Sequence, residues 1–486
     1  MKFKTERPLK NGCERIPFSY ANTRTVIIGA ACAAFMNVLD GTIVNVSLPS
    51  MVRDFKLDTS QGVYVLLAYS IMMACTVLMF GKLADRRGMR PVMIWGFLLF
   101  TASSLLCGLA PTLPVLVAGR FLQGIGGGML SATSLGAIGY YLPPDRRGWG
   151  VGIISAAAAL GATLGAPLGG FLSELLGWRW IFLVNIPVGL AAWWLAAFRF
   201  PRDHEDRDVA DESSLDVTGV LLSVSALSAL LYAITRGPED GWFSPSVLGG
   251  FIFSMALFIA FLISEHRCRD PLLDMNLFKD RRFLTANMAN FFTSMLVAGI
   301  LFLMPFFFIF VRDLSPSATG AALMLFSGVY VLVSPVAGRL SDRMGVRFLT
   351  TGGMALASVV LFLFTALMDS ATLAMPIAML MLMGVAYGAY LSPNNRQILS
   401  LAPEDRQGSA SGILRLFFYL GQPLGVALVE SVLRTGMPAA NISVSNWSLL
   451  NQADLTAAFQ VGFAVCGTLA VLSACCSFLS GVVRKE

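Results

Sequence analysis

The sequence predicts an all-α polytopic membrane protein with 14 transmembrane helices. Of its 486 residues, 56% are hydrophobic and only 13% are charged, whereas about 25% of the residues in an average soluble domain are charged. Continuous apolar runs such as residues 92–110 reach the length of about 20 residues that a helix needs to cross a bilayer. Such runs differ from the weak alternation of apolar and polar residues that is typical of a membrane β-barrel.

Fourteen apolar segments follow one another along the chain, separated by short connectors rich in glycine, proline and charge. They cover about residues 25–49, 61–83, 91–110, 113–138, 148–172, 178–199, 215–235, 245–264, 284–311, 318–338, 348–368, 371–393, 408–432 and 457–481. The first run is longer than the roughly 7–15 apolar residues of a signal-peptide core, so we expect it to remain in the protein as a span.

The positive charges predict which side of the membrane each connector faces. With the N-terminus inside, 27 of the 35 Lys and Arg residues fall in inner segments, six in outer segments, and two, Arg120 and Arg415, inside spans. Because inner loops of membrane proteins carry the excess of Lys and Arg, we expect both termini to be cytoplasmic. This placement also accounts for the net charge of +6 without a nucleic-acid partner.

Motifs of other protein classes do not occur in the sequence. The eight cysteines and two histidines form no cluster with metal-ligand spacing, so we expect no metal and no disulfide framework. No GxxxxGK[ST] phosphate loop is found, which argues against an ATP-driven pump. No group of polar catalytic residues gathers near one interface, and we therefore expect the protein not to be an enzyme.

Two sequence echoes indicate an internal repeat. The connector "GKLADRRGMR" (81–90) matches "AGRLSDRMGVR" (337–347) at an offset of 257 residues, and "PPDRRG" (143–148) matches "PEDRQG" (403–408) at an offset of 260. Two six-span halves related in this way are typical of transporters, whose substrate path lies between the halves. The repeat predicts a tail (1–24), an N-terminal half (25–200), a linker with two inserted helices (201–282) and a C-terminal half (283–482).

The motifs resemble a known family of transporters. "GKLADRRGMR" resembles the inter-helix signature of the major facilitator superfamily, and "LDGTIVNVSLP" (39–49) resembles the first-span motif of its fourteen-helix drug/proton antiporter branch. "WRWIFLVNIPVG" (178–189) and "PLLDMNLFKDRRF" (271–283) are also similar to stretches of that branch. The resemblance implies the major facilitator fold, with two six-helix halves plus two inserted helices. It also implies transport driven by a proton gradient, without a bound cofactor.

The repeated connectors are candidates for a conformational latch. The resemblance implies that the first connector latches the outward-open state and that the second is a weaker echo of it. The residues concerned are Gly81, Asp85, Arg86, Gly88 and Arg90 in the first connector, and Gly338, Asp342, Arg343 and Gly345 in the second. A carboxylate can accept hydrogen bonds at a helix N-terminus, arginines can pair with acids across the seam between the halves, and glycines allow close approach and a tight turn. The alternative is that these charges only set the topology.

Two charged residues inside spans are the candidates for proton coupling. At 1.5 Å per residue, Asp40 lies about 14 Å and Arg120 about 10 Å from the outer ends of their spans, so their depths agree. Charged groups at such depths usually face a cavity or a partner, and the resemblance associates the matching arginine with proton coupling. The alternative for Arg120 is that its side chain extends outward to the lipid head groups.

Other polar and small residues are candidates for cavity lining and helix packing. Asn37, Asp40, Val44 and Ser47 share a helix face, which we expect to face a central cavity, and Arg415, Tyr419 and Gln422 share another. Arg415 in the cavity would favour an anionic or zwitterionic substrate; alternatively it extends inward to the head groups. Further cavity candidates are Asn185, Asn287, Asn290 and Asn394, and candidates for close helix packing are Gly152, Gly161, Gly165, Pro167, Gly169 and Gly170.

Together these features predict a proton-coupled exporter of small organic compounds, of the multidrug type, that works by alternating access. The alternatives are an exporter of a specific metabolite or of an anionic or zwitterionic compound, and a membrane sensor with the same fold. The expected partners are a small-molecule substrate, protons and the lipid bilayer. We expect a monomer in the plasma membrane (the cell inner membrane).

Overall fold

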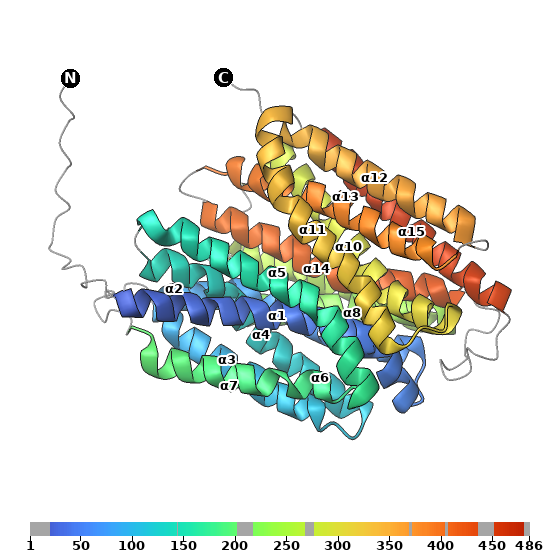
Figure 1. Cartoon of the computed structure of the whole chain (residues 1–486), viewed down its shortest axis with the longest axis horizontal. Coiled ribbons are helices and arrows are strands. Elements are labelled where there is room, and N and C mark those ends of the chain that lie inside the picture. Colours follow the sequence, from blue (N-terminus) through green and yellow to red (C-terminus); the bar gives the residue numbers. More distant parts are fainter. Residues whose placement is uncertain are drawn as a thin grey trace.

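The computed structural model describes residues 20–142, 144–201, 217–267, 277–368, 372–403, 407–435 and 452–480, and in these ranges every regular element is helical (Figure 1). The first helices are α1 (Tyr20–Asp54), α2 (Thr59–Arg87), α3 (Met89–Gly108), α4 (Leu113–Tyr141), α5 (Pro144–Leu175), α6 (Trp180–Leu183), α7 (Asn185–Arg199), α8 (Val217–Asp240) and α9 (Pro245–Arg267). They are followed by η1 (Leu277–Lys279), α10 (Arg281–Phe306), η2 (Phe307–Val311), α11 (Pro316–Met344), α12 (Val346–Leu367), α13 (Ala374–Ser400), α14 (Gln407–Thr435) and α15 (Gln452–Leu479).

In the part of the chain that the structure describes, fourteen stretches of helix are long and apolar enough to cross a membrane, which agrees with the predicted number of spans. The sixth span consists of α6 and α7 with a distorted turn at Val184. Pro187 explains the distortion, because a proline has no N–H to donate to the carbonyl four residues earlier, here that of Leu183. Similarly, Pro305 precedes the wide turn η2, which completes the ninth span.

Equivalent helices of the two halves make equivalent contacts. In the N-terminal half α1 packs on α5, α2 on α4, and α3 on α4 and α7; in the C-terminal half α10 packs on α14, α11 on α13, and α12 on α13 and α15. The halves meet through α5 against α11 and α14 against α2, two pairs that the repeat relates to each other. The pseudo-symmetry of the sequence is therefore present in the packing.

The repeated connectors have the same backbone conformation in both halves. Gly88 has φ 96° and ψ 155°, and Gly345 has φ 87° and ψ 144°. The N–H of Gly88 donates to the carbonyl of Ala84, and that of Gly345 to the carbonyl of Ser341. Only glycine adopts such positive φ values without strain, so both glycines are required by the turn that ends one span and begins the next.

This conformation makes a matched pair of substitutions informative. We expect Gly88→Ala to lower the free energy of unfolding by about 1–3 kcal/mol, because an alanine is strained at that φ. Gly81→Ala serves as the control, since an added Cβ at Gly81 meets no atom within 4 Å. Thermal unfolding of the two variants in detergent checks this expectation, and equal melting temperatures would contradict it.

We call the end of the bundle where α1 begins and α2 ends the amino end, and the opposite end, where α1 ends and α2 begins, the far end. At the far end α5 and α11 are in backbone contact: a Cβ at Gly170 would collide with the carbonyl of Pro316, and one at Gly320 with the carbonyl of Ala166. The Ser317 hydroxyl and N–H also donate to the Glu174 carboxylate at 2.5 and 3.0 Å. Figure 1 shows α5 and α11 converging toward this end.

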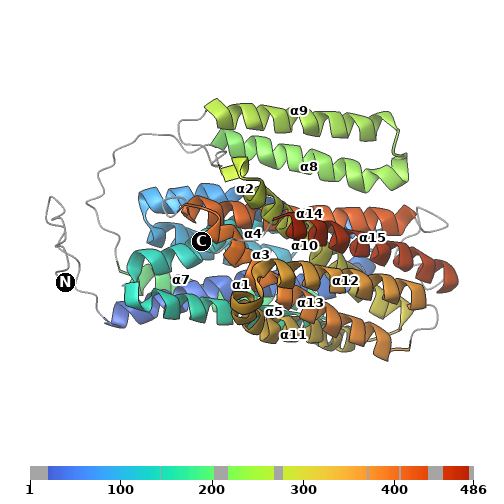
Figure 2. The ribbon, with the colours of Figure 1, turned by 90° about the horizontal axis from the view of Figure 1, so that it is seen from above.

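The inserted helices α8 and α9 lie together on one side of the bundle (Figure 2). Helix α8 packs on α2 and α14, and α9 packs mainly on α8. Helix α9 exposes large apolar side chains such as Ile252, Phe253 and Met255. Such a surface fits lipid, because an apolar face of this size is not stable in water.

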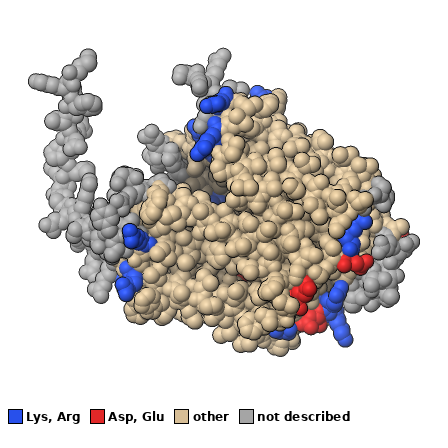
Figure 3. Space-filling model, in the orientation of Figure 1, with Lys and Arg blue, Asp and Glu red and all other residues tan. Residues whose placement is uncertain are grey.

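Charged side chains are concentrated at the two ends of the bundle. On the face shown in Figure 3, the broad middle of the molecule is almost entirely tan, and the charged side chains lie at the left, along the upper edge and at the lower right. The amino end on this face shows only Lys and Arg, whereas the far end shows both signs of charge. This is the distribution expected of a protein that crosses a bilayer with an excess of positive charge on one side.

Candidate functional site

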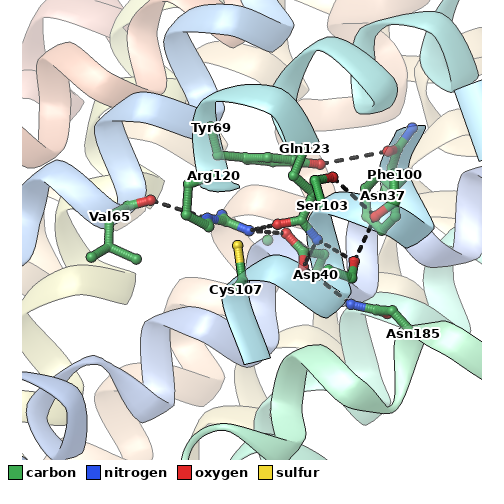
Figure 4. Close-up of polar contacts among 12 residues, drawn as sticks. Asn37, Asp40, Val65, Tyr69, Phe100, Ser103, Cys107, Arg120, Gln123 and Asn185 are labelled. Atoms are coloured by element: carbon green, nitrogen blue, oxygen red, sulfur yellow. Dashed lines mark hydrogen bonds and ion pairs between the residues drawn. The ribbon is translucent and has the colours of Figure 1, made fainter. Parts of the chain in front are cut away.

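The structure brings Asp40 and Arg120 together inside the N-terminal half. Arg120 Nη1 lies 2.5 Å from Asp40 Oδ2, and the two side chains are 1% and 0% exposed. Arg120 also donates from Nε to the carbonyl of Val65 at 3.1 Å and from Nη1 to Gln123 Oε1 at 2.7 Å. The guanidinium therefore does not extend to the lipid head groups, because its hydrogen bonds hold it between α1, α2 and α4 (Figure 4).

The second oxygen of Asp40 accepts hydrogen bonds from two amides. Gln123 Nε2 donates to Asp40 Oδ1 at 2.9 Å, and Asn185 Nδ2 donates to the same oxygen at 3.3 Å. Gln123 Nε2 also donates to the hydroxyl of Ser104 at 2.8 Å. A buried carboxylate needs such partners, since an unpaired buried charge costs several kcal/mol. Sequence reasoning missed Gln123, although it lies one helical turn after Arg120.

A cavity of about 210 Å³ lies between the two halves. Its walls come from α1, α2 and α5 of the N-terminal half and from α10, α11, α13 and α14 of the C-terminal half. On the side of α1, the lining includes Asn37, Gly41, Thr42 and Asn45. A central cavity with contributions from both halves is where alternating-access transporters bind their substrates.

Tyr69 separates this cavity from the ion pair. Tyr69 lines the cavity, and the Arg120 guanidinium lies over its ring at 4.2 Å from the centroid. The Tyr69 hydroxyl donates to Asn37 Oδ1 at 3.5 Å, and Asn37 Nδ2 donates to the carbonyl of Gly127 at 3.2 Å. The Tyr69 ring thus contacts the guanidinium and also lines the cavity, a role that no sequence pattern indicated.

Asp40 and Ser47 do not line the cavity, contrary to the expectation from the helix face that they share with Asn37. Ser47 donates to the carbonyls of Ile43 and Gly169 and accepts from Ser173. On α1 the cavity face follows Asn37, Gly41 and Asn45 at four-residue intervals, whereas Asp40 points into the N-terminal half. The predicted stripe was therefore rotated from the true cavity face by about one residue, or 100°.

Four asparagines that were cavity candidates are buried and do not line the cavity of about 210 Å³. Asn185 binds Asp40, as described above. Asn287 Nδ2 donates to the carbonyl of Phe283, and Asn290 Nδ2 to the carbonyl of Leu414, both at 2.9 Å. Asn394 is 1% exposed and is not among the lining residues. Asparagine side chains inside a membrane bundle also form hydrogen bonds that join neighbouring helices.

Arg415 joins the two halves instead of lining the cavity. Its Nη1 donates to the carbonyl of Ser131 at 2.7 Å, and the hydroxyls of Ser131 and Tyr419 lie 2.8 Å apart. Tyr419 and Gln422, which share a face with Arg415, do line the cavity. Ser131 lies in the amino-end half of α4 and Arg415 in the amino-end half of α14. These bonds therefore link α4 to α14 on the amino-end side of the cavity.

We expect Tyr419→Phe to weaken the link between α4 and α14 without loss of folding. Loss of one hydrogen bond of about 1 kcal/mol changes an opening equilibrium about five-fold. Hydrogen exchange of the α4 and α14 backbones near Ser131 should become faster in the variant. Tyr232→Phe on α8, where Tyr232 is 45% exposed, is the control; equal exchange in both variants would show that the Ser131 contact does not hold the halves together.

The glycines of α5 pack against α1 and α11. A Cβ at Gly161 would lie 2.7 Å from the carbonyl oxygen of Phe35, and one at Gly169 would lie 2.7 Å from that of Ile43. Gly165 faces Thr42, and Gly170 faces Pro316 as described above; Pro167 lies next to Gly320 of α11. Gly152 is the exception, because a Cβ there meets no atom within 4 Å.

The structure describes the side chains of only some of the predicted latch residues. The side chains of Asp85 and Asp342 lie outside the described residues, Arg86 is half-buried, and Arg343 is exposed. Arg90 donates to the carbonyls of Ala196 and Ala197 at the end of α7. These contacts lie within the N-terminal half and not across the seam. A Cβ at Gly338 would lie 2.8 Å from the Ser392 hydroxyl, whereas Gly81 has open space and makes no close approach.

Comparisons with known proteins place this geometry in a family. Residues 30–426 match the family described as Major Facilitator Superfamily. The riboflavin transporter RibZ of Clostridioides difficile is 32% identical over 409 residues, which are 84% of this chain and 87% of that protein. The multidrug resistance protein Stp of Mycobacterium tuberculosis is 32% identical over 417 residues, 85% of this chain and 76% of that protein. The puromycin resistance protein pur8 of Streptomyces alboniger is 31% identical over 420 residues, 85% of this chain and 82% of that protein.

Solved structures have the same fold. A bacterial homologue of the lysosomal transporter Spinster, in an inward-facing and unoccupied conformation, superposes with a TM-score of 0.70 at 17% identity, covering 95% of this chain and 97% of that one. A D-xylose–proton symporter gives a TM-score of 0.65 at 16% identity, covering 95% and 98%. At such identities the likeness concerns the fold alone, while the sequence matches are extensive. The chain therefore belongs to the Major Facilitator Superfamily.

Proposed function

We propose that the protein is a proton-coupled exporter of small organic molecules that works by alternating access. The observation that carries this proposal is the fully buried Asp40–Arg120 pair, which lies directly behind the cavity wall at Tyr69. Ionisable residues inside a membrane are costly and mark proton or substrate pathways. Relatives named for multidrug or puromycin resistance support export as the direction of transport.

Proton binding to Asp40 would act through the Arg120 guanidinium. Neutralising the carboxylate removes the charge that holds Nη1, and the guanidinium keeps its bonds to Val65 and Gln123. Because Arg120 stacks on Tyr69, and Tyr69 is bonded to Asn37, a change at the pair reaches two side chains that line the cavity. A proton can bias the two transport states only if it binds them with different affinity, and this contact supplies the difference.

Alternating access requires that the contacts of the two ends break in turn. In the present structure α5 and α11 are in close backbone contact at the far end, and α4 and α14 are linked toward the amino end by the bonds to Ser131. We place the amino end in the cytoplasm of the cell, with the protein as a monomer in the plasma membrane. The excess of Lys and Arg in the connectors at that end supports this orientation.

An exporter of one specific metabolite is the second candidate. The relative named as a riboflavin transporter supports it, and so does the compact cavity of about 210 Å³. By contrast, selection of an anionic or zwitterionic substrate by Arg415 loses its basis, because that guanidinium binds the Ser131 carbonyl outside the cavity lining.

Transport by purified protein in proteoliposomes with an acidic lumen tests the proposal. A panel of cationic, neutral and anionic fluorescent compounds is added outside, and we expect at least one of them to accumulate in the lumen as protons leave. A protonophore should stop this accumulation. Accumulation that a protonophore leaves unchanged would contradict proton coupling, and a single transported compound would favour the metabolite exporter.

A further inference from the structure

Among the described residues, the cavity lining contains no formally charged side chain. Among the described residues that line it, the polar ones are asparagine, glutamine, serine, threonine and tyrosine, and the others are apolar. A charged ligand in such a site loses its hydration shell and gains no opposite charge, which costs several kcal/mol. A cavity without charge thus disfavours lipophilic cations as well as carboxylates.

The charged groups Asp40 and Arg415 are engaged elsewhere. Asp40 is 0% exposed and accepts hydrogen bonds from Arg120, Gln123 and Asn185, so its carboxylate is not available to a ligand cation. Arg415 donates to a backbone carbonyl of α4. Neither group is among the residues of the cavity wall, and recognition of a ligand rests on uncharged side chains.

Three aromatic rings form one wall of the cavity, which we call the aromatic wall: Phe326, Tyr330 and Tyr387. The rings of Phe326 and Tyr387 are stacked, with centroids 5.9 Å apart and planes inclined by 24°. Tyr330 meets the edge of Tyr387 at a centroid distance of 5.2 Å and an angle of 75°. Packed rings of this kind are held rigidly and present flat apolar surface, which suits a planar aromatic ligand.

Several uncharged polar groups of the cavity lining lack hydrogen-bond partners among the described residues. The hydroxyls of Tyr330 and Tyr387 and the amide of Gln422 have no hydrogen-bond partner among the described residues, although all three residues line the cavity. Polar groups in a largely buried site are normally satisfied by protein, water or ligand. They can exchange water for a ligand that carries both a donor and an acceptor.

We propose that the cavity binds uncharged, planar aromatic compounds that carry neutral hydrogen-bonding groups, in preference to aromatic cations or anions of the same shape. The volume of about 210 Å³ is below the roughly 300–1,000 Å³ of typical ligand pockets, which favours a compact ring system. This inference names the substrate class of the proposed exporter and rests on that proposal. It is tested by binding alone, which needs no gradient and no transport.

The test compares three tricyclic probes on the detergent-purified protein at neutral pH by fluorescence titration. Acridone is neutral and has one N–H and one carbonyl group, 9-aminoacridine is a cation with N–H groups, and acridone-4-carboxylate is an anion. We expect saturable binding of acridone that is at least about ten-fold tighter than that of either ion, because a desolvated unpaired charge costs several kcal/mol. Equal or tighter binding of either ion, or absence of saturable acridone binding, would overturn the inference.

Conservative variants locate the probe at the aromatic wall. Tyr387→Phe and Gln422→Leu keep the apolar packing and should each weaken acridone binding about five-fold, the effect of one lost hydrogen bond. Tyr232→Phe on the inserted helix α8, where Tyr232 is 45% exposed, should leave binding unchanged. Acridone binding that is insensitive to both cavity variants would overturn the inference. Selective binding without proton-driven transport would instead contradict only the proposed exporter.

Discussion

Asp40→Asn is expected to abolish proton-driven transport, with a loss of at least about 100-fold in the rate of gradient-driven uptake into proteoliposomes. Asparagine has nearly the shape of aspartate and can still accept from Gln123 and Asn185, but it cannot bind and release a proton. Removing one partner of a buried ion pair also destabilises a protein by about 3–5 kcal/mol. The variant should therefore melt earlier than the wild type, and ligand binding is measured alongside transport.

Two further variants separate the proton function from stability. Asp40→Asn combined with Arg120→Gln removes both charges, and we expect thermal stability to recover while gradient-driven uptake remains absent. Asp313→Asn is the matched control: Asp313 is exposed, and its φ of 51° is one that asparagine tolerates. Full gradient-driven uptake by the Asp40 variant, at wild-type protein levels in the vesicles, would refute the role of this carboxylate.

Gly320→Ala is expected to open the far end and slow transport. The added methyl would collide with the backbone carbonyl of Ala166, and backbone atoms cannot rotate away as a flexible side chain can. Overpacking of this kind costs about 1–3 kcal/mol. If the cost falls on the state in which α5 and α11 touch, the equilibrium between transport states shifts roughly 5- to 150-fold toward the state in which they separate.

Hydrogen exchange at the far ends of α5 and α11, together with transport rates, checks this expectation. Gly328→Ala in the same helix is the control, because a Cβ at Gly328 meets no atom within 4 Å. We expect faster exchange near Pro316 and at least about ten-fold slower transport in Gly320→Ala alone. If the two alanine variants exchange and transport alike, the contact between α5 and α11 does not hold the far end closed.

The fold was predictable because its signals are local. Apolar runs of membrane length define the 14 spans, and Gly88 and Gly345 at an offset of 257 residues predict two equivalent turns, which the structure contains with nearly equal backbone angles. The family was recognisable for the same reason, since its motifs are short and continuous. The division into a tail, two halves and a linker stays a prediction about how the chain folds and evolved.

The site was only partly predictable, since helix periodicity shows which residues share a face and not where that face points. Depth alone indicated that Asp40 and Arg120 could meet. It could not show that Asp40 faces away from the cavity while Asn37 lines it. Gln123 and Tyr69 were missed because a single glutamine or tyrosine in an apolar helix indicates no function in the sequence. Its role becomes clear only when its partners in the structure are known. Arg415 was misplaced because a long side chain can reach a backbone carbonyl of another helix.

Proton movement that accompanies substrate transport is the most direct test of whether transport is coupled to protons through Asp40. A pH-sensitive dye is enclosed in proteoliposomes that have no initial pH gradient, and a transported compound is added outside. We expect a substrate-dependent change of lumenal pH with the wild-type protein and none with Asp40→Asn. Uptake of the compound by the wild type without any proton movement, or equal proton movement in the variant, would contradict it.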